Sequence, residues 1–488
     1  MSDSLSSAPL LLRRPWLLLW IALAFASAWI RLLPWRLEYN DLAKQAFVSF
    51  EMVTEGAWWV QRSPDGEMAT KPPLCGWMSA GIYLLSGSWL LAWHLPSVLG
   101  MLAILFAYRR WLPPVPAAAA MVMLLWNHMS QSMIFVIRTD MVLAATIFLP
   151  VGLIATRLRD QQPLSGKDQG LLLLWITLGL YTKGPVNFAF LLPGVLLFFC
   201  RCRNRPASRL ALPSPWIWPA ALVLFLAWVG IAALKSPEFV EQVIFGEFGS
   251  RFQSGESAEG RPPGYYTLHF LSRFAPWSLL FFAILLHRPT RQRLWQQPDT
   301  CWLLCILAGG WILMELIPSK RPDRFYPIFP VAAFLIARAW PQTPGATLRK
   351  TVNTVLLILV AANVSYSFNR WQRNTARGEG NFVTFGREAA TRVAPEDLWI
   401  QKTAAWATGI VLHAGSTQIV DDEALVDRWL RGELPAVIVC EAGLARFEAA
   451  GISVTPVLST DNPRAARPQQ FLLLAEDRNE QTAEGWGW

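Results

Sequence analysis

Two acidic residues, Asp41 and Asp140, stand beside long apolar segments, where a charged side chain needs a partner or a function. Asp41 opens a helix-like run over residues 40–55, and Asp140 opens an apolar run. Taken alone, each is better explained as a helix cap that satisfies backbone N–H groups. A carboxylate can also act as a general base when it lies within hydrogen-bond reach of a reacting hydroxyl. If both acids lie on one side of a membrane with cations nearby, the pattern favours catalysis.

Four cations stand in turns that proline makes rigid. Lys71, Lys183 and Lys320 each lie within two residues of a proline, and Arg261 directly precedes one. Lysine binds phosphate as a point charge, and arginine binds it as a bidentate fork. Each cation alone is about as well explained by contact with lipid headgroups or by pairing with nearby glutamates. The three turn lysines together favour an anion site, and a phosphate near the headgroup plane is the natural candidate.

The composition is that of a protein that crosses a membrane many times. Apolar residues make up 53% of the chain and charged residues only 16%, whereas soluble domains carry about 25% charge. Many of the 26 tryptophans lie at the ends of apolar runs, where amphipathic rings settle at the headgroup level. The net charge of +9 is explained by basic loops held on the cytoplasmic side. We therefore expect no nucleic-acid partner.

The positive-inside rule decides how the apolar runs cross the membrane. Arg13 and Arg14 before the first run indicate a cytoplasmic N-terminus and a retained signal anchor. If residues 74–90 lie on or dip into the outer membrane surface, every later basic cluster falls inside. Counting that run as a span would invert all of them. We therefore predict eleven spans, near residues 15–34, 91–111, 114–136, 140–158, 169–183, 184–201, 214–234, 271–288, 300–317, 323–341 and 349–368.

From residue 369 onward the pattern changes to that of a small soluble domain. Three strand-length apolar runs alternate with three helix-like stretches, which predicts an α/β domain. The predicted domains are a transmembrane domain, residues 1–368, and a soluble α/β domain on the outer (periplasmic) face, residues 369–488. The strand-length runs are 398–400, 436–439 and 471–474, and the helix-like stretches are 404–413, 422–430 and 444–450.

The order of these motifs resembles the polyprenyl-phosphate-sugar-dependent integral-membrane glycosyltransferases of the C-type fold (glycosyltransferase family 39). That family includes 4-amino-4-deoxy-L-arabinose lipid A transferases and protein O-mannosyltransferases. The resemblance covers about residues 13–340. It rests on the helix opened by Asp41, Lys71-Pro72-Pro73, Asp140, Tyr181-Thr182-Lys183-Gly184-Pro185, Arg251-Phe252 with Arg261-Pro262, and Ser319-Lys320-Arg321-Pro322.

The resemblance implies an inverting transfer of a sugar from a polyprenyl-phosphate donor at the outer face of a bacterial inner membrane. The acceptor would be lipid A, another lipid, a glycan or a protein. Asp41 would be the catalytic carboxylate, as a general base or by positioning the acceptor, and Asp140 would be the second acid. Fixed cations would stabilise the leaving phosphate as it gains charge. The residues implied for that phosphate are Lys71, Lys183, Arg261 and Lys320.

Two other interpretations stay open from the sequence alone. A transporter or flippase for a lipid-linked sugar would carry charged or broken helices at mid-membrane, whereas the acids here stand at segment ends, which favours the enzyme. A non-catalytic assembly subunit would tolerate loss of Asp41. The five histidines lack metal-ligand spacing and there is no glycine-rich nucleotide loop, so we expect no structural metal and no nucleotide. No cofactor is certain, although a divalent cation is compatible with the resemblance.

Overall fold

The computed structural model describes residues 14–33, 41–62, 68–202, 212–249, 261–318, 320–339, 346–376, 382–404, 408–460 and 469–475. The chain divides into two compact units, residues 1–31 with 70–370, and residues 32–69 with 371–488. The second unit therefore includes residues 32–69, which we call the first polar loop, although the sequence pattern predicted them as part of the transmembrane domain.

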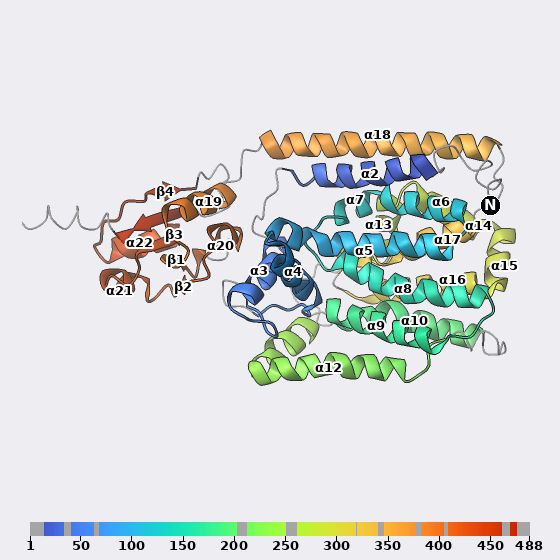
Figure 1. Cartoon of the computed structure of the whole chain (residues 1–488), viewed down its shortest axis with the longest axis horizontal. Helices are drawn as coiled ribbons and strands as arrows, with labels where there is room; N and C mark the ends of the chain where they lie inside the picture. The colour runs from blue at the N-terminus through green and yellow to red at the C-terminus, as the bar shows by residue number, and fades with distance from the viewer. Residues whose placement is uncertain are drawn as a thin grey trace, which may run out of the picture. The chain divides into compact units, whose positions relative to one another are not determined.

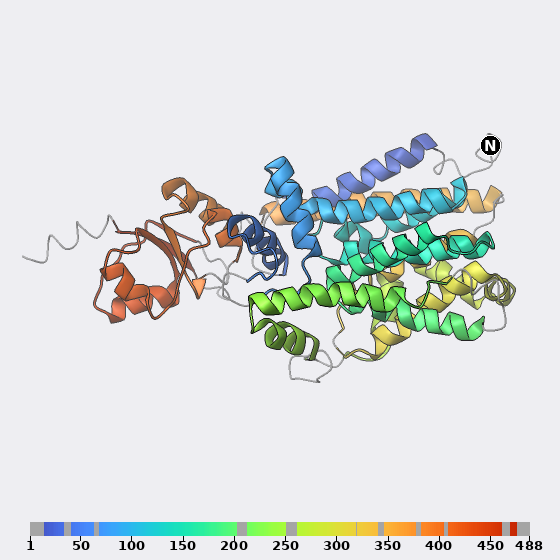
Figure 2. The same ribbon diagram turned by 60° about the horizontal axis from the view of Figure 1, so that its bottom comes forward.

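The first unit is a bundle of apolar helices (Figures 1 and 2). Among the described residues, five helices are long and apolar enough to cross a membrane, or six if a bent pair counts as one span. The chain is thus a mostly helical, polytopic membrane protein, and the number eleven stays a prediction. Its helices are α2 (Arg14–Ile30), α4 (Leu74–Ser86), α5 (Trp89–Trp111), α6 (Pro114–Leu125), α7 (His128–Met133), α8 (Asp140–Arg159), α9 (Gly166–Lys183), α10 (Val186–Arg201), α12 (Ile217–Lys235), a π-helix (Val240–Gly249), α13 (Tyr265–Arg273), α14 (Trp277–Leu286), α15 (Arg288–Gln296), α16 (Pro298–Leu316), a 3₁₀ turn η3 (Pro322–Phe325), α17 (Ile328–Ala339) and α18 (Ala346–Ala376).

Two of the predicted spans are broken helices. The run 114–136 is split into α6 and α7, because the Asn127 side chain caps α7 and accepts a hydrogen bond from the Ser130 N–H at 2.8 Å. The run 271–288 starts earlier, at Tyr265, and bends by 119° between α13 and α14. Such breaks are tolerated at membrane depth only where protein surrounds the exposed backbone groups. Apolar periodicity alone does not reveal them.

Residues 74–90 form the short helix α4, a glycine turn and the start of α5. α4 has 13 residues, so it is about 20 Å long against a hydrocarbon core of about 30 Å. Gly87 ends it with φ +65°, a left-handed conformation that favours glycine. Ser88 then caps α5 through the Leu91 N–H. A helix this short fits the predicted surface segment better than a span.

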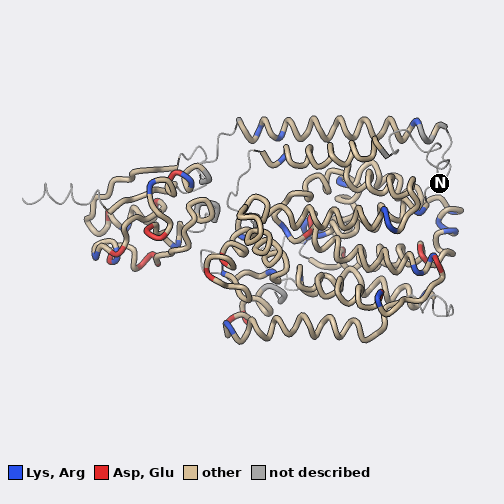
Figure 3. The backbone as a smooth tube through the Cα atoms, in the orientation of Figure 1, with Lys and Arg blue, Asp and Glu red and all other residues tan. Residues whose placement is uncertain are grey.

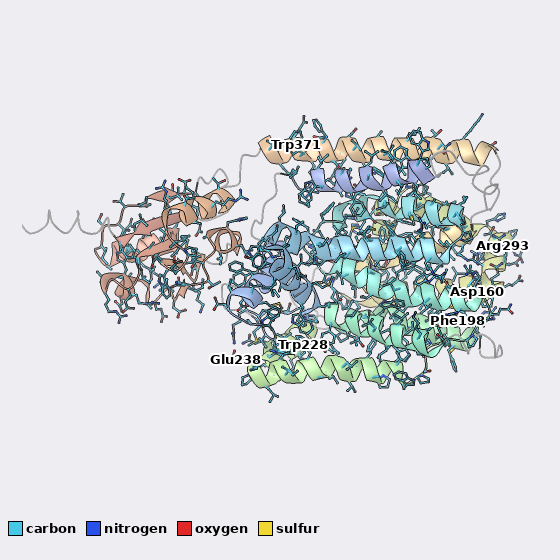
Figure 4. All side chains as sticks on the ribbon, viewed as in Figure 1. Asp160, Phe198, Trp228, Glu238, Arg293 and Trp371 are labelled. Carbon is cyan, nitrogen blue, oxygen red and sulfur yellow. The ribbon has the colours of Figure 1, made fainter. Side chains whose placement is uncertain are left out.

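One end of the bundle is rich in arginine. The last turns of α5, α8 and α10 all carry arginine, and α15 carries more. Asp160 and Arg293 lie at this end, and Glu238 lies at the opposite end (Figure 4). Arg157 pairs with Asp168 at 2.9 Å, which ties the end of α8 to the start of α9. We expect this basic end to face the cytoplasm.

The second unit contains a five-stranded mixed sheet in the order β2-β1-β3-β5-β4. β1 pairs in parallel with β2 and β3, and β5 pairs antiparallel with β3 and β4. The three predicted strand-length runs are the strands β1, β3 and β5. The elements are β1 (Leu398–Gln401), β2 (Ile419–Val420), β3 (Ala436–Cys440), β4 (Leu458–Ser459), β5 (Gln470–Leu474), α19 (Phe382–Arg392), α20 (Thr408–Ala414), α21 (Leu425–Leu430) and α22 (Glu441–Ala449).

Both faces of this sheet are covered, so its strands are apolar at successive positions. Val437 and Val439 pack with Trp429 of α21 and Phe447 of α22 in one buried cluster. Ile438, whose side chain points to the other face, is also fully buried. α19 packs on α20, and α20 packs on α3 (Asp41–Thr54) from the first polar loop. The loop helix is therefore part of the sheet domain's packing.

Candidate active site

The first residue of α8 and the last residue of α9 form a buried ion pair. Lys183 Nζ lies 2.5 Å from Asp140 Oδ1, and the two residues are only 8% and 3% exposed. Taking two charges out of water costs several kcal/mol each, so a pair like this is weak evidence for stability alone. Ionisable groups buried in a helical membrane bundle are functional candidates by default.

Glycine packing sets where Lys183 lies. One turn earlier in α9, a Cβ on Gly179 would stand 1.8 Å from the Asn187 side chain and 3.2 Å from the Thr146 hydroxyl. Thus α8, α9 and α10 meet at a point that admits no side chain. Gly184 then ends α9 at φ +64°, a conformation that other residues adopt with strain. The backbone therefore favours glycine at position 184, directly after Lys183.

A second acid, Asp323 in η3, extends the pair into a charge network. Its carboxylate lies 3.0 Å from Arg138 Nη1 and 3.4 Å from Arg321 Nε. The charge of Lys183 also acts on it. Asp323 is not among the predicted site residues, although it directly follows the motif that contains Lys320. Its partner Arg138 is 185 residues away, which local patterns cannot predict.

Two of the predicted phosphate cations, Arg261 and Lys320, come together. Lys320 is 8% exposed, and its ammonium donates to the Arg261 carbonyl oxygen at 3.1 Å. The Arg261 guanidinium is exposed and lies 5.2 Å from the centroid of the Tyr265 ring. Lys320 therefore holds the backbone that presents Arg261, while the phosphate role of both residues stays a prediction.

The segment that begins with Lys71 lies beside the buried pair. Lys71 Nζ donates to Thr70 Oγ1 at 3.0 Å. Cys75, in the first turn of α4, lies close enough for the charges of Asp140 and Lys183 to act on its thiol. The Trp77 and Tyr181 rings, 5.6 Å apart, hold α4 against the end of α9. Lys71 thus lies four residues before Cys75, whose thiol is close to the Asp140–Lys183 pair.

Asp41 opens α3 in the second unit, and its side chain lies outside the described residues. The helix itself is held by buried aromatic side chains and by a hydrogen bond to the sheet domain. Phe47 and Phe50 are buried, and Glu55 Oε1 accepts a hydrogen bond from Thr417 Oγ1 at 2.6 Å. The catalytic role of Asp41 stays a prediction, on a helix anchored to the sheet domain. Within the described ranges, no group of three His, Cys, Asp or Glu side chains is placed to hold a metal ion, so a divalent cation also stays a prediction.

Glu51 makes the stability of this helix depend on pH. Burial raises the pKa of Glu51 from 4.5 to about 7, against the opposing hydrogen bond from the Arg62 N–H. A raised carboxyl pKa favours the folded state below pH 4.5, and this contribution is lost as the pH rises through 7. We expect Glu51→Gln to stabilise the full chain above pH 7 by about 1–3 kcal/mol and to change nothing in acid. Thermal melting of the parent and of Glu51→Gln across this pH range measures the difference in stability. A difference in melting temperature that does not change with pH would contradict the prediction.

Comparison with known proteins supports the motif-based resemblance. No family model matches the chain. It is 27% identical over 372 residues to the undecaprenyl phosphate-α-4-amino-4-deoxy-L-arabinose arabinosyl transferase of Serratia proteamaculans, a match that covers 71% of this chain. The match spans 63% of that curated relative, which is less than two thirds of its length.

Solved structures share the fold at low sequence identity. ArnT from Cupriavidus metallidurans bound to undecaprenyl phosphate matches 94% of this chain and 98% of its own, with a TM-score of 0.68 and 16% identity. The apo oligosaccharyltransferase of Archaeoglobus fulgidus matches 86% of this chain and 69% of its own, with a TM-score of 0.51 and 10% identity. These likenesses, with the order of the motifs, confirm the resemblance to the polyprenyl-phosphate-sugar-dependent membrane glycosyltransferases of the C-type fold.

Proposed function

We propose that this protein transfers a hexosyl or pentosyl unit from a polyprenyl-phosphate-linked donor to an envelope acceptor, with inversion at the anomeric carbon. The observation that carries the proposal is the buried pair of Asp140 and Lys183, extended by Asp323 and its two arginines. A bundle that only spans a membrane has no need of such charges in its interior. The fold supports the donor class, and so does the undecaprenyl-phosphate donor for which the Serratia relative is named.

The cations act on the leaving group. As the bond between the sugar and the phosphate oxygen breaks, the phosphate gains negative charge, and fixed cations stabilise this change without reorganising. Arg261 offers an exposed guanidinium that a phosphate oxygen can approach. Lys183 is held by Asp140, so its charge is fixed in position before the donor binds. Preorganised charge of this kind lowers the barrier, whereas a mobile lysine would have to be ordered first.

Asp41 acts as the general base that activates the attacking hydroxyl. The acceptor hydroxyl attacks the anomeric carbon, the bond from that carbon to the phosphate oxygen breaks, and the hydroxyl proton passes to the Asp41 carboxylate. The products are the glycosylated acceptor and the free polyprenyl phosphate. The positive-inside arrangement supports a site on the outer face, a cytoplasmic N-terminus and a periplasmic C-terminal domain. Lipid A, another lipid, a glycan and a protein are the acceptor classes compatible with this location.

A flippase for a lipid-linked sugar is the second candidate, because the broken pair α13 and α14 is a feature that transporters use. Transporters place their working charges near mid-membrane, at broken helices. Here Asp140 is the first residue of α8 and Lys183 the last of α9, so the pair lies at helix ends. This position favours the enzyme.

Mass spectrometry of envelope lipids and glycans tests the proposed function. A strain that lacks the gene is compared with strains that express the parent or Asp140→Asn. We expect one glycosylated species to disappear in the deletion strain, to return with the parent and to stay absent with Asp140→Asn. If the protein were a flippase, its deletion would instead cause the lipid-linked donor to accumulate on the inner leaflet, and the purified protein would fail to transfer sugar in detergent.

Lys71→Ala is expected to weaken use of the donor. Loss of one charge-assisted contact to phosphate costs about 1.5–3 kcal/mol, or roughly tenfold or more in kcat/KM for the donor. The measurement is a transfer assay with purified full-length protein at varied donor concentration. Lys167→Ala is the matched control, because Lys167 is an exposed lysine at the opposite end of α9 from Lys183. Equal donor dependence in both variants would remove Lys71 from the phosphate site.

A further inference from the structure

A second group of basic residues gathers away from the Asp140–Lys183 pair. It comprises Arg31 after α2, His128 at the start of α7, Arg273 at the end of α13 and Arg370 near the end of α18; we call it the arginine cluster. The ring of Tyr366 joins two of its members: Arg31 Cζ lies 4.8 Å from its centroid, and the His128 ring centroid lies 5.3 Å away.

The remaining two members are placed by their effect on His128. The charges that act on His128 are those of Arg31, Arg273 and Arg370. Arg273 Nη1 also lies 3.5 Å from Met129 Sδ, next to His128 in the chain. Four elements that are far apart in sequence therefore bring three arginines and a histidine to one place. Figure 1 shows α2 alongside α18, and α7 packs against α2.

Hydrogen bonds hold Arg31 in the arginine cluster, but one of its guanidinium nitrogens has no acceptor among the described residues. Its Nε donates to Ser367 Oγ at 2.7 Å, and its Nη2 donates to Asn363 Oδ1 at 2.6 Å. Ser27 Oγ lies 2.8 Å from the same Ser367 oxygen, which adds to the contact between α2 and α18. The residue is only 2% exposed, yet its Nη1 is buried with no hydrogen-bond partner among the described residues. A buried donor without a partner is costly, so an acceptor for this N–H would stabilise the protein.

The cluster also lacks a compensating acid. Within the described ranges, none of Arg31, Arg273 and Arg370 forms an ion pair with Asp or Glu, whereas Arg138 at the candidate active site does. Figure 3 shows Lys and Arg positions as blue bands near both ends of α18. Like charges brought together without an anion repel one another and destabilise the fold. An anion between them would remove the repulsion and satisfy Arg31 Nη1.

We infer that the arginine cluster binds the phosphate headgroup of an anionic glycerophospholipid. The surroundings of the arginine cluster indicate that the phosphate belongs to a lipid and is not free phosphate. α18 carries exposed apolar residues along its length, including Ile358, Val364 and Phe368, and only 11% of its apolar window is buried. Acyl chains can lie along this surface while the phosphate reaches Arg370, which is exposed and close enough to Arg31 for the two charges to interact. Arginine is suited to this task because its planar fork matches phosphate oxygens.

Native mass spectrometry of the purified full chain tests this inference. The protein is titrated with phosphatidylglycerol, with phosphatidylethanolamine and with inorganic phosphate. We expect a preference for phosphatidylglycerol that weakens about tenfold in Arg273→Gln and in Arg370→Gln, because each removes a charged contact to phosphate. Arg373→Gln is the control: Arg373 is an exposed arginine one turn further along α18 and is not part of the cluster.

Each outcome decides the assignment. Selective weakening in the two cluster variants, with Arg373→Gln like the parent, supports the site. Equal affinity in all four proteins, or equal weakening in Arg373→Gln, would show only general attraction to a charged helix end and would overturn it. Binding of inorganic phosphate without any preference for phosphatidylglycerol would overturn the lipid source. If Arg273→Gln does not fold, the exposed Arg370→Gln carries the test by itself. Sugar transfer is not the readout, so failure of the proposed function leaves this result interpretable.

Discussion

Asp140→Asn and Lys183→Met are each expected to abolish sugar transfer and to destabilise the protein by about 3–5 kcal/mol. The reason is that each variant leaves the other charge buried without its partner. The pair is 2.5 Å apart with both residues almost inaccessible, so solvent cannot take over the lost contact. Thermal unfolding in detergent and a transfer assay with the polyprenyl-phosphate donor measure the two effects separately.

The double variant Asp140→Asn/Lys183→Met separates function from folding. Replacing both charges with uncharged groups removes the unpaired charge, and such replacements are often neutral or stabilising. We therefore expect the double variant to melt near the parent temperature and still to transfer no sugar. If it recovered both stability and transfer, the pair would be a structural feature only. If it stayed as unstable as the single variants, the buried-charge explanation of their instability would be wrong.

Asp41→Asn is expected to lower transfer by about 10²–10⁴-fold while the protein inserts and accumulates normally. An amide cannot accept the proton of the acceptor hydroxyl, yet it is nearly the same size as the carboxylate. The measurement is kcat for transfer from a saturating donor, with expression and melting temperature followed in parallel.

Glu55→Gln is the matched control on the same loop, because it makes the same carboxylate-to-amide change. Its amide oxygen can still accept the hydrogen bond from Thr417 that the parent makes at 2.6 Å. We expect this control to retain transfer. Full activity in Asp41→Asn would exclude Asp41 as the base.

The helices of the bundle were predictable because their signals are local. Runs of apolar residues, arginines at segment ends and prolines in turns predict where a helix begins and ends. They matched α5, α8 and α10 to within a few residues. The breaks after α6 and after α13 were not predicted, because Asn127 and the turn before Trp277 interrupt runs that remain apolar throughout.

The candidate site was predictable in part. Residue types, turns and the expected side of the membrane selected Asp140 and Lys183 separately. Their pairing across 43 residues was not predicted. Asp323 was missed because an acid beside three cations is typical of an ordinary turn, and the sequence does not show that Arg138 is its distant partner. Arg31 was missed because nothing near it in sequence shows that Asn363 and Ser367, more than 330 residues away, would bury it.

The sequence by itself determined that this is a polytopic membrane protein with an α/β domain, and which residue types stand at its turns. Hydrophobic length, charge asymmetry and turn chemistry are properties of neighbouring residues, so they can be read along the chain. The tertiary structure decided which charges share a buried space and that α3 packs with the C-terminal sheet. Those outcomes depend on how distant helices fit, at contacts such as Gly179 against Asn187, where a single methyl group would force the Asn187 side chain to move.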